Sequence, residues 1–255
     1  MGFADLHIHS IYSYDGTCTI PAILKYVAEK TDLKVIAITD HDSIAGIQEA
    51  KELGPHYGID VIPACEVSTA DGHLLALFID RLVQPGRTLT DTVLEIADQG
   101  GLCIAAHPTA RGTSSLSFET ICRSLQHPTV PKCLVGVEAF NGGLVYTRNN
   151  PTVAARAALL PLAKVGNSDA HILSIIGQGS TEFSGSTARE LRSALETRQT
   201  LVRVGKGLSG LEVIKKYIPG YLLRKLGWAL WNAQPSAPLQ YIRLSRLMME
   251  NPNAH

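Results

Sequence analysis

Short apolar, β-branched runs that alternate with segments of helical period constrain the fold of this chain more than any other feature. Six such runs read as strands, at residues 34–39, 60–63, 74–79, 102–106, 134–137 and 163–166. The repeated β-α units predict an α/β fold with mainly parallel strands buried on both faces. An open doubly wound sheet and a closed barrel both satisfy this pattern, and the spacing alone does not choose between them.

Three helices are predicted by their start signals. Pro21 lies in the first turn of one helix, and Asn150 followed by Pro151 caps and starts another that runs to about residue 160. Thr187 and Glu190 have the spacing of a capping box, which predicts a helix through residue 195. The regular alternation of strands and helices ends near residue 204.

The composition changes beyond Gly205, so we divide the chain into a domain of residues 1–205 and a helical extension of residues 206–255. Residues 206–231 are cationic and amphipathic, and a last helix is expected from about residue 239 to about residue 250. This extension either packs on the domain or on a second subunit, as a homo-oligomer contact, or lies on a membrane surface with its tryptophans at the interface.

Charge and cysteine usage limit the partners and the compartment. Lys and Arg number 23, as do Asp and Glu, so the formal net charge is zero and no extended nucleic-acid track is expected. No secretory signal is read at the N-terminus, and no apolar run reaches the roughly 18 residues that span a membrane. The five cysteines form no Cys-x-x-Cys pair, so we expect a soluble, cytoplasmic protein with small buried cysteines. Cys65 is of interest because it precedes a candidate metal ligand.

Histidines gather at the ends of the predicted strands, beside carboxylates. Six of the nine histidines have this placement, and they are His7, His9, His41, His73, His107 and His171. Side chains two positions apart on a strand share a face, so Asp5, His7 and His9 point the same way. Asp169 and His171 form a second pair of this kind.

A single histidine at a strand end is usually a structural residue, and His56, His127 and His255 are assigned to that class. The co-occurrence of the other six is informative because sites in parallel α/β folds assemble at the carboxyl ends of strands. Imidazole and carboxylate without sulfur suit Zn²⁺, Mn²⁺ or Fe²⁺, and this many donors predict two or three ions. Glu66, read as the end of its strand, is placed to bridge two of them.

Five motifs follow one another along the chain: ADLHIHS at residues 4–10, ITDHD at 38–42, ACEVS at 64–68, IAAHP at 104–108 and GNSDAH at 166–171. In this order they resemble the PHP (polymerase and histidinol phosphatase) superfamily, over about residues 3 to 204. The resemblance implies a distorted (βα)₇ barrel, followed here by the C-terminal helical extension. It therefore favours the barrel over the open sheet.

The resemblance also implies a ligand set for each of three ions. These are His7, His9, Glu66 and Asp169 for one ion, Glu66, His73 and His107 for a second, and Asp15, His41 and His171 for a third. Some members carry a histidine where this chain has Asp15, which bears on the strength and the metal of the third site. His73 depends on the loop at residues 69–72, and the alternative is a surface histidine.

Several further residues are assigned supporting roles. Asp5, and Asp40 and Asp42 beside His41, are placed behind the ligands, where a carboxylate orients a ligand imidazole. Arg111 and Arg148 are candidates for a phosphate clamp, because guanidinium matches two phosphate oxygens at once. Glu138 and Asn141 resemble a family segment at the rim of the site, and no role is assigned to them.

The chemistry expected from this resemblance is phosphoester hydrolysis. A hydroxide bridging ions about 3.5 to 4 Å apart would attack phosphorus, with Glu66 as the bridging ligand. His41 or His171 would protonate the leaving oxygen if the third ion is absent. The chain looks most like the stand-alone phosphoesterases, whose substrate would be a small, nucleotide-like phosphomonoester or phosphodiester, or an oligonucleotide end. The alternatives are a metal-stabilised interaction or membrane-associated module with little turnover, and a hydrolase of C–N bonds.

Overall fold

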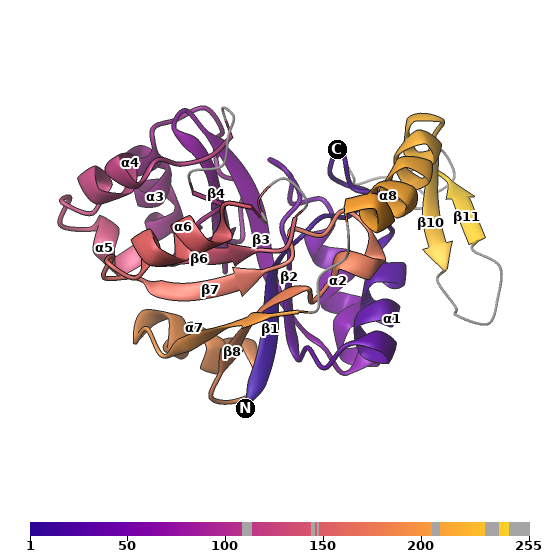
Figure 1. Ribbon diagram of the computed structural model, residues 1–255, viewed down its shortest axis with the longest axis horizontal. Coiled ribbons are helices and arrows are strands. Elements are labelled where there is room, and N and C mark those ends of the chain that lie inside the picture. Colours follow the sequence, from indigo (N-terminus) through magenta and orange to yellow (C-terminus); the bar gives the residue numbers. More distant parts are fainter. Residues whose placement is uncertain (109–113, 144–145, 147, 206–209, 233–239, 245–255) are drawn as a thin grey trace.

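A nine-stranded mixed sheet forms the centre of the molecule in the computed structural model, which describes residues 1–108, 114–143, 146, 148–205, 210–232 and 240–244. The strand order is β7-β6-β5-β4-β3-β2-β1-β8-β9. The strands are β1 (Gly2–Ile8), β2 (Val35–Ile38), β3 (Asp60–Thr69), β4 (Gly72–Leu77), β5 (Leu102–Ala105), β6 (Leu134–Asn141), β7 (Ala163–Asn167), β8 (Gly179–Phe183) and β9 (Thr200–Val204). The expectation of a barrel is confirmed, because this sheet curls into a nearly closed barrel (Figure 1).

Side chains join the ends of the curled sheet. The Thr181 hydroxyl on β8 contacts the backbone N–H and carbonyl of Gly166 on β7, at 3.2 and 3.0 Å. The Thr200 hydroxyl on β9 donates to the carbonyl of Lys164 on β7, at 2.9 Å. These bonds hold the barrel nearly closed without a continuous backbone ladder between the two edges.

The strand directions correct the expectation of mainly parallel pairing. Four neighbouring pairs are parallel, but β3–β4, β4–β5, β1–β8 and β8–β9 are antiparallel. The β3–β4 pair is a hairpin, since only two residues separate Thr69 from Gly72. Glu66 therefore lies inside β3 rather than at its end. His73 lies on β4 opposite Ser68, next to the short turn on which its assignment depended.

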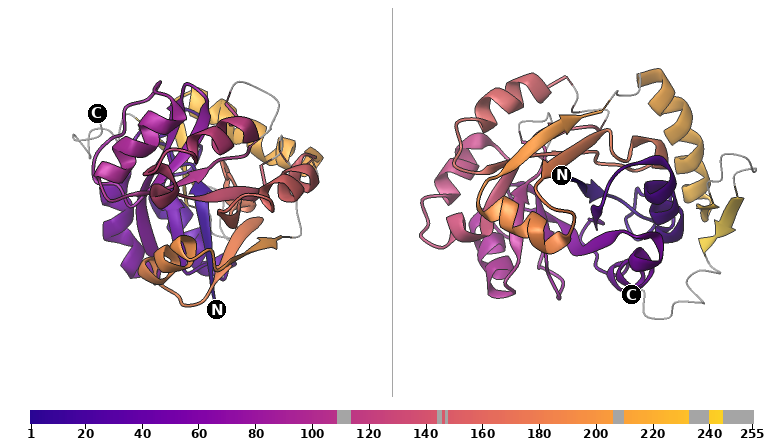
Figure 2. Two further views of the ribbon diagram at one scale, coloured as in Figure 1. Left: turned by 90° about the vertical axis from the view of Figure 1, so that its left-hand side faces the viewer. Right: turned by 90° about the horizontal axis from the view of Figure 1, so that it is seen from below.

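Helices cover the outside of the barrel, as Figure 2 shows from two further directions. They are α1 (Ile20–Lys30), α2 (Ile47–Leu53), α3 (Leu89–Asp98), α4 (Phe118–Ser124), α5 (Val130–Cys133), α6 (Asn150–Ala157), α7 (Ala188–Glu196) and α8 (Gly210–Lys225), with 3-10 turns η1 (Gly54–Tyr57) and η2 (Leu173–Ile175). Their apolar faces pack on the strands, as α1 does through Ile23, Leu24 and Val27. The core therefore has apolar layers between the sheet and the helices. A further buried cluster draws side chains from β1 to β8 all around the barrel, among them Leu6, Ile62 and Leu75.

Two helix starts can be compared with the expectations. The capping box of α7 is confirmed, with Thr187 and Glu190 bonded reciprocally. The start of α6 differs, because Asn149 is the N-cap and Asn150 lies within the helix. The Asn150 amide instead bonds both the backbone N–H and the carbonyl of Asn141 at the end of β6, at 3.0 and 2.9 Å.

Replacing Thr187 by alanine is expected to lower the free energy of unfolding by about 1 kcal/mol, because it removes a helix N-cap. Urea denaturation measures this difference. Thr197→Ala at the opposite end of α7 is the control, since that exposed hydroxyl bonds the Ser193 carbonyl of its own helix. This substitution should cost less than about 0.5 kcal/mol. Equal losses in both variants would contradict the role given to the capping box.

Four of the five cysteines are buried, as expected, but Cys122 on α4 is exposed. Cys65 is an inert thiol, because burial raises its pKa and its Sγ donates to the Asp40 carbonyl at 3.4 Å. Within the described residues, no helix is both long and apolar enough to cross a membrane.

The C-terminal extension begins with a helix, α8, and continues with a hairpin of β10 (Trp228–Asn232) and β11 (Gln240–Arg243). The expectation of a helix from about residue 239 is therefore wrong at residues 240–243, which pair with β10. Residues 245–250 lie outside the described residues. The strand forms here because β10 supplies a partner some ten residues earlier in the chain, which local helical periodicity does not reveal.

Candidate metal centre

All nine side chains predicted as ligands lie in one cluster at the mouth of the barrel. His7 lies near the end of β1, His9 follows that strand, and His41 follows β2. Glu66 and His73 come from the paired strands β3 and β4, His107 follows β5, and Asp169 and His171 follow β7. Asp15 comes from the loop between β1 and α1. Within the described residues, these side chains form four groups that share members. In each group, one donor atom from every side chain lies within 4.8 Å of the others.

Glu66 is the hub of the cluster. It is buried, and each of its oxygens is approached by imidazole nitrogens. The distances are 2.8 Å to His73 Nδ1 and 3.1 Å to His107 Nε2 from Oε1, and 3.1 Å to His7 Nε2, 3.2 Å to His41 Nδ1 and 3.3 Å to His9 Nε2 from Oε2. Burial alone would raise the pKa of Glu66, but His7 and the other imidazoles outweigh it and hold the pKa well below its usual range.

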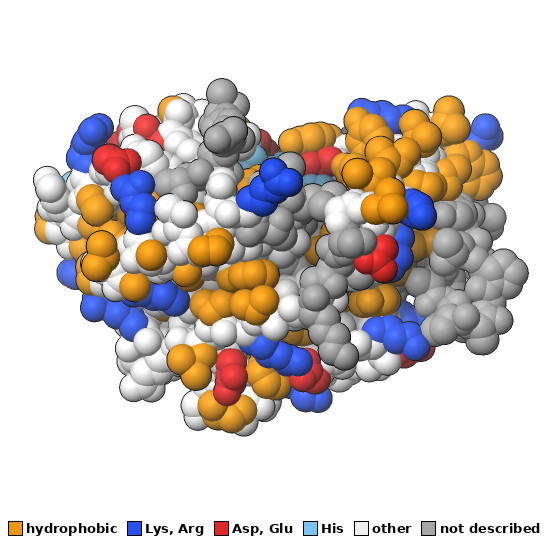
Figure 3. Space-filling view, viewed as in Figure 1, with side chains coloured by type: hydrophobic (Ala, Val, Ile, Leu, Met, Phe, Trp, Pro, Cys, Tyr) orange, Lys and Arg blue, Asp and Glu red, His pale blue; other side chains and the backbone are white. Residues whose placement is uncertain are grey.

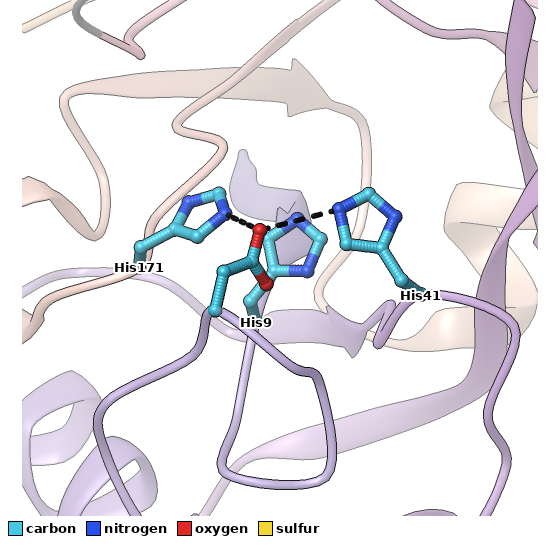
Figure 4. Close-up of side chains that lie close together, drawn as sticks. His9, His41 and His171 are labelled. Atoms are coloured by element: carbon cyan, nitrogen blue, oxygen red, sulfur yellow. Dashed lines mark hydrogen bonds and ion pairs between the residues drawn. The ribbon is translucent and has the colours of Figure 1, made fainter. Parts of the chain in front are cut away.

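Asp15 is the centre of a second group, at the edge of the cluster. Its Oδ2 lies 3.0 Å from His171 Nε2 and 3.5 Å from His41 Nε2. Figure 4 shows these two rings and His9 gathered around a carboxylate. Burial opposes ionisation, yet the contact with Asp15 raises the pKa of His171 to about 9 and lowers the pKa of the Asp15 carboxyl. His9 is affected in the opposite direction. Burial and the positive charge of His171 lower the pKa of His9 to about 4.

Several buried nitrogens in the cluster lack a hydrogen-bond partner among the described residues. They are His7 Nε2, both ring nitrogens of His9, His41 Nδ1 and His73 Nδ1. Most approach carboxylate oxygens closely, but without the alignment of a hydrogen bond. An unpaired buried polar atom lowers the stability of a protein by about 1 to 3 kcal/mol, so several such nitrogens together indicate missing partners. This set of donors fits divalent cations as those partners. Imidazole and carboxylate ligands of this kind suit Zn²⁺, Mn²⁺ or Fe²⁺.

Glu138 on β6 supports the cluster from behind, a role that the sequence left open. Its Oε1 lies 2.9 Å from His7 Nδ1, and its Oε2 accepts from the backbone N–H of His107 at 2.7 Å. The amides of Asn141 and Asn167 donate to the two remaining lone-pair positions, at 3.0 and 2.8 Å. Glu138 therefore orients the ring of one predicted ligand and the backbone of another, an arrangement that carboxylates behind metal ligands adopt.

Asp5 and Asp40 also lie behind the ligands, but their contacts correct the role expected for them. Asp5 accepts from the backbone N–H groups of Ser168 and Gly177, at 3.0 and 2.9 Å. Asp40 accepts from the N–H and the hydroxyl of Ser10, both at 2.6 Å. Burial raises the pKa of each carboxyl to about 6. These residues hold the loops that carry ligands, and Asp42 does the same by accepting from the backbone N–H of Ser68 at 2.8 Å.

Two of the predicted ligands have a backbone conformation that non-glycine residues rarely adopt. The φ angles are 27° at His107 and 51° at Asp169. Such conformations cost about 1 to 3 kcal/mol each and persist where the surrounding structure enforces them, often at functional sites. Here the bond from His107 N–H to Glu138 and the bond from the Asn141 amide to Asp169 Oδ2, at 3.3 Å, help to enforce them.

The cluster of predicted ligands borders a pocket of about 340 Å³ with aromatic walls. Tyr146 stacks on His107 with ring centroids 4.5 Å apart, Tyr14 stacks on His41 at 4.9 Å, and Tyr217 of α8 meets His171 edge-on. Of the two arginines predicted as a phosphate clamp, Arg148 is exposed and is not among the described residues that line this pocket. Arg111 lies outside the described residues.

Comparison with known families and proteins yields consistent similarities. A family model described as PHP domain matches residues 5–196. An uncharacterized protein of Methanocaldococcus jannaschii is 34% identical over 147 residues, which cover 54% of this chain and 81% of that protein. A phosphoribosyl 1,2-cyclic phosphate 1,2-diphosphodiesterase of Eggerthella lenta is 34% identical over 97 residues, 36% of each chain. A 5'-3' exoribonuclease of Haemophilus influenzae is 29% identical over 205 residues, 76% of this chain and 63% of that protein.

A solved structure shares the fold. It is a two-domain protein from Bacteroides vulgatus that contains a predicted PHP-like metal-dependent phosphoesterase, with a TM-score of 0.61 at 18% identity. The match covers 94% of this chain and 75% of that one. At this identity the likeness concerns the fold, and it extends over most of the chain described above.

Proposed function

This chain belongs to the PHP domain family and is a metal-dependent phosphoester hydrolase, and from that premise we propose that it cleaves a small, nucleotide-like phosphoester. The observation that supports this most directly is the cluster around Glu66, where five imidazoles meet one buried carboxylate. Such a cluster is suited to bind more than one cation close to a substrate phosphate.

Two or three divalent cations would be held by the nine clustered side chains, with Zn²⁺, Mn²⁺ and Fe²⁺ as the candidates. The bound cations would supply an activated water and neutralise charge on the phosphate oxygens. Glu66 keeps the ligand rings converged, and Glu138 fixes the orientation of His7. Where no third cation is bound, His171 holds a proton at Nε2 against Asp15 and can pass it to the leaving oxygen.

The proposed substrate class rests on the pocket and on two relatives. A volume of about 340 Å³ is at the small end of small-molecule sites, which span roughly 300 to 1,000 Å³. The rings of Tyr14, Tyr146 and Tyr217 offer flat surfaces on which a base or sugar can rest. The names of the relatives from E. lenta and H. influenzae describe a ribose phosphodiester and an RNA as substrates. We therefore propose a phosphoester carried on a ribose or nucleotide, or on an oligonucleotide end.

A substrate panel tests this function. The protein is loaded separately with Mn²⁺, Zn²⁺ and Fe²⁺ and assayed on an aryl phosphate, nucleoside monophosphates, cyclic ribose phosphates and short oligoribonucleotides. We expect phosphate release or chain cleavage from the ribose-containing substrates, abolished in Asp169→Ala and retained in Asp98→Ala at the end of α3. A folded, metal-loaded protein that is inert on the whole panel would contradict the proposal and favour an interaction module.

A second function, contact with an anionic membrane surface, is proposed for α8. A row of apolar side chains on this helix is between 45% and 62% exposed, and Figure 3 shows them gathered on the surface. The row consists of Leu211, Ile214, Ile218 and Leu222. Lys215, Lys216 and Lys225 are exposed on the same helix, so an anionic lipid surface would complement both the apolar and the charged side chains.

Flotation with lipid vesicles tests this contact. We expect the protein to float with vesicles that contain anionic lipid and to remain in solution with neutral vesicles. The double variant Ile214→Ser, Ile218→Ser should lose the flotation without losing phosphoesterase activity. A wild-type protein that stays in solution with both kinds of vesicle would exclude this function.

A further inference from the structure

The loop between β1 and α1 positions Asp15 and is folded tightly on itself. The Ile11 N–H donates to the Cys18 carbonyl at 2.9 Å, and the Ser13 N–H donates to the Ser10 carbonyl at 3.1 Å. At Gly16 a Cβ would meet the Ser10 carbonyl oxygen at 1.8 Å, so only glycine fits this fold of the loop. Asp15 reaches His171 and His41 because the backbone on either side of it is held in this shape.

Arg224, near the end of α8, binds this loop from outside the barrel. Its Nη2 donates to the carbonyls of Ile11 and Ser13, at 2.8 and 3.4 Å, and its Nε donates to the carbonyl of Gly16, at 3.2 Å. These three carbonyls lie on both sides of Asp15 in the sequence. A guanidinium group presents several donors in a fixed plane, which suits it to hold three carbonyls at once.

The strand after α8 holds the other end of the same loop. Leu230 on β10 donates its N–H to the Thr17 carbonyl at 3.0 Å and accepts from the Thr19 N–H at 3.1 Å. Ala229 and Leu244 pack against Ile11 in a small buried cluster. Figure 2 shows α8 and the hairpin lying along the N-terminal segment, so this part of the chain packs on the barrel.

We propose that Arg224 is a positioning residue that holds the Asp15 loop, so that the C-terminal element completes the part of the metal centre formed by Asp15, His41 and His171. The inference rests on the proposed function only in requiring that the cluster binds cations. Among the described residues, Arg224 bonds carbonyls of the loop and no predicted ligand atom, so its effect on a cation passes through the backbone of residues 11–16.

Cation binding by four variants tests this proposal. Equilibrium titration with Mn²⁺ compares wild type, Asp15→Asn, Arg224→Met and the double variant, with Lys216→Ala on the exposed face of α8 as control. We expect Asp15→Asn and Arg224→Met to weaken the same class of Mn²⁺ sites by about 10- to 100-fold. The double variant should resemble Asp15→Asn alone, because the two residues act through one contact. Lys216→Ala should bind as wild type does.

The outcomes are separable from those of the substrate panel. Wild-type Mn²⁺ binding in Arg224→Met, an unchanged titration in Asp15→Asn, or losses that multiply in the double variant would each overturn the proposal. If circular dichroism shows that Arg224→Met does not fold, Arg224→Lys replaces it. Lysine keeps the positive charge but lacks the forked guanidinium group, so this variant should bind Mn²⁺ with intermediate affinity. Wild-type affinity in Arg224→Lys would overturn the proposal. If Asp15→Asn and Arg224→Met weaken the same Mn²⁺ sites but the wild-type protein has no phosphoesterase activity, the proposed function is refuted and this inference stands.

Discussion

Glu66→Gln is expected to lower kcat/KM for phosphoester hydrolysis by about a thousandfold or more. The side chain approaches five imidazoles, and Glu66 belongs to two of the groups of donors that could hold a cation. Glutamine keeps the shape but removes the charge and turns one acceptor into a donor that faces ligand nitrogens. A loss of about 4 kcal/mol of stabilisation, which corresponds to three powers of ten in rate, is the scale expected for metal-ion catalysis.

Steady-state kinetics and metal analysis of the same preparation measure this effect. Glu95→Gln is the matched control, because Glu95 is a half-buried carboxylate on α3 that bonds the Gln84 N–H and Arg87 away from the cluster. Its kcat/KM and metal content should equal those of wild type. A Glu66→Gln enzyme that keeps both full metal content and a rate within tenfold of wild type would contradict the role assigned to Glu66.

Glu138→Gln is expected to weaken metal binding by about 10- to 100-fold, the usual effect of removing a carboxylate that orients a ligand. Both oxygens of Glu138 face donors, since His7 and Asn167 approach Oε1 while His107 N–H and Asn141 bond Oε2. A glutamine amide placed here must direct its NH₂ group at one of these donors. The mismatch is buried, so stability should also fall by about 1 to 3 kcal/mol.

Metal titration and thermal unfolding of Glu138→Gln test the two effects separately. Glu119→Gln, on the exposed surface of α4, controls for the loss of one negative charge. If Glu138→Gln loses stability but binds metal with wild-type affinity, Glu138 serves the fold and not the ligands. If Glu138→Gln binds metal more weakly under conditions in which the variant is fully folded, the orienting role is supported.

The strands and the ligand cluster could be predicted because they depend on local patterns. The six apolar runs each contain or overlap an observed strand, and motifs at their ends converge because neighbouring strands bring those ends together. The capping box of α7 needs only residues three apart in the chain. In each of these examples the determining contact is either local or a direct consequence of strand pairing.

The remaining features depend on contacts between distant parts of the chain. Glu138 acts on His7, which is 131 positions earlier, and nothing in its own strand marks it as different from other buried carboxylates. Arg224 belongs to a cationic run that resembles a solvent-facing or membrane-facing helix surface until its bonds to the Asp15 loop are known. The antiparallel direction of β4 and the pairing of β10 with β11 likewise arise from tertiary packing.

The number of cations bound by the folded protein, measured together with phosphoester hydrolysis before and after chelation, tests the central claim most directly. The account predicts at least two equivalents of Mn²⁺, Zn²⁺ or Fe²⁺ per chain, loss of activity on chelation, and recovery of activity in step with rebinding. A folded protein that hydrolyses its phosphoester at full rate after complete chelation, or that binds fewer than two equivalents, would contradict it.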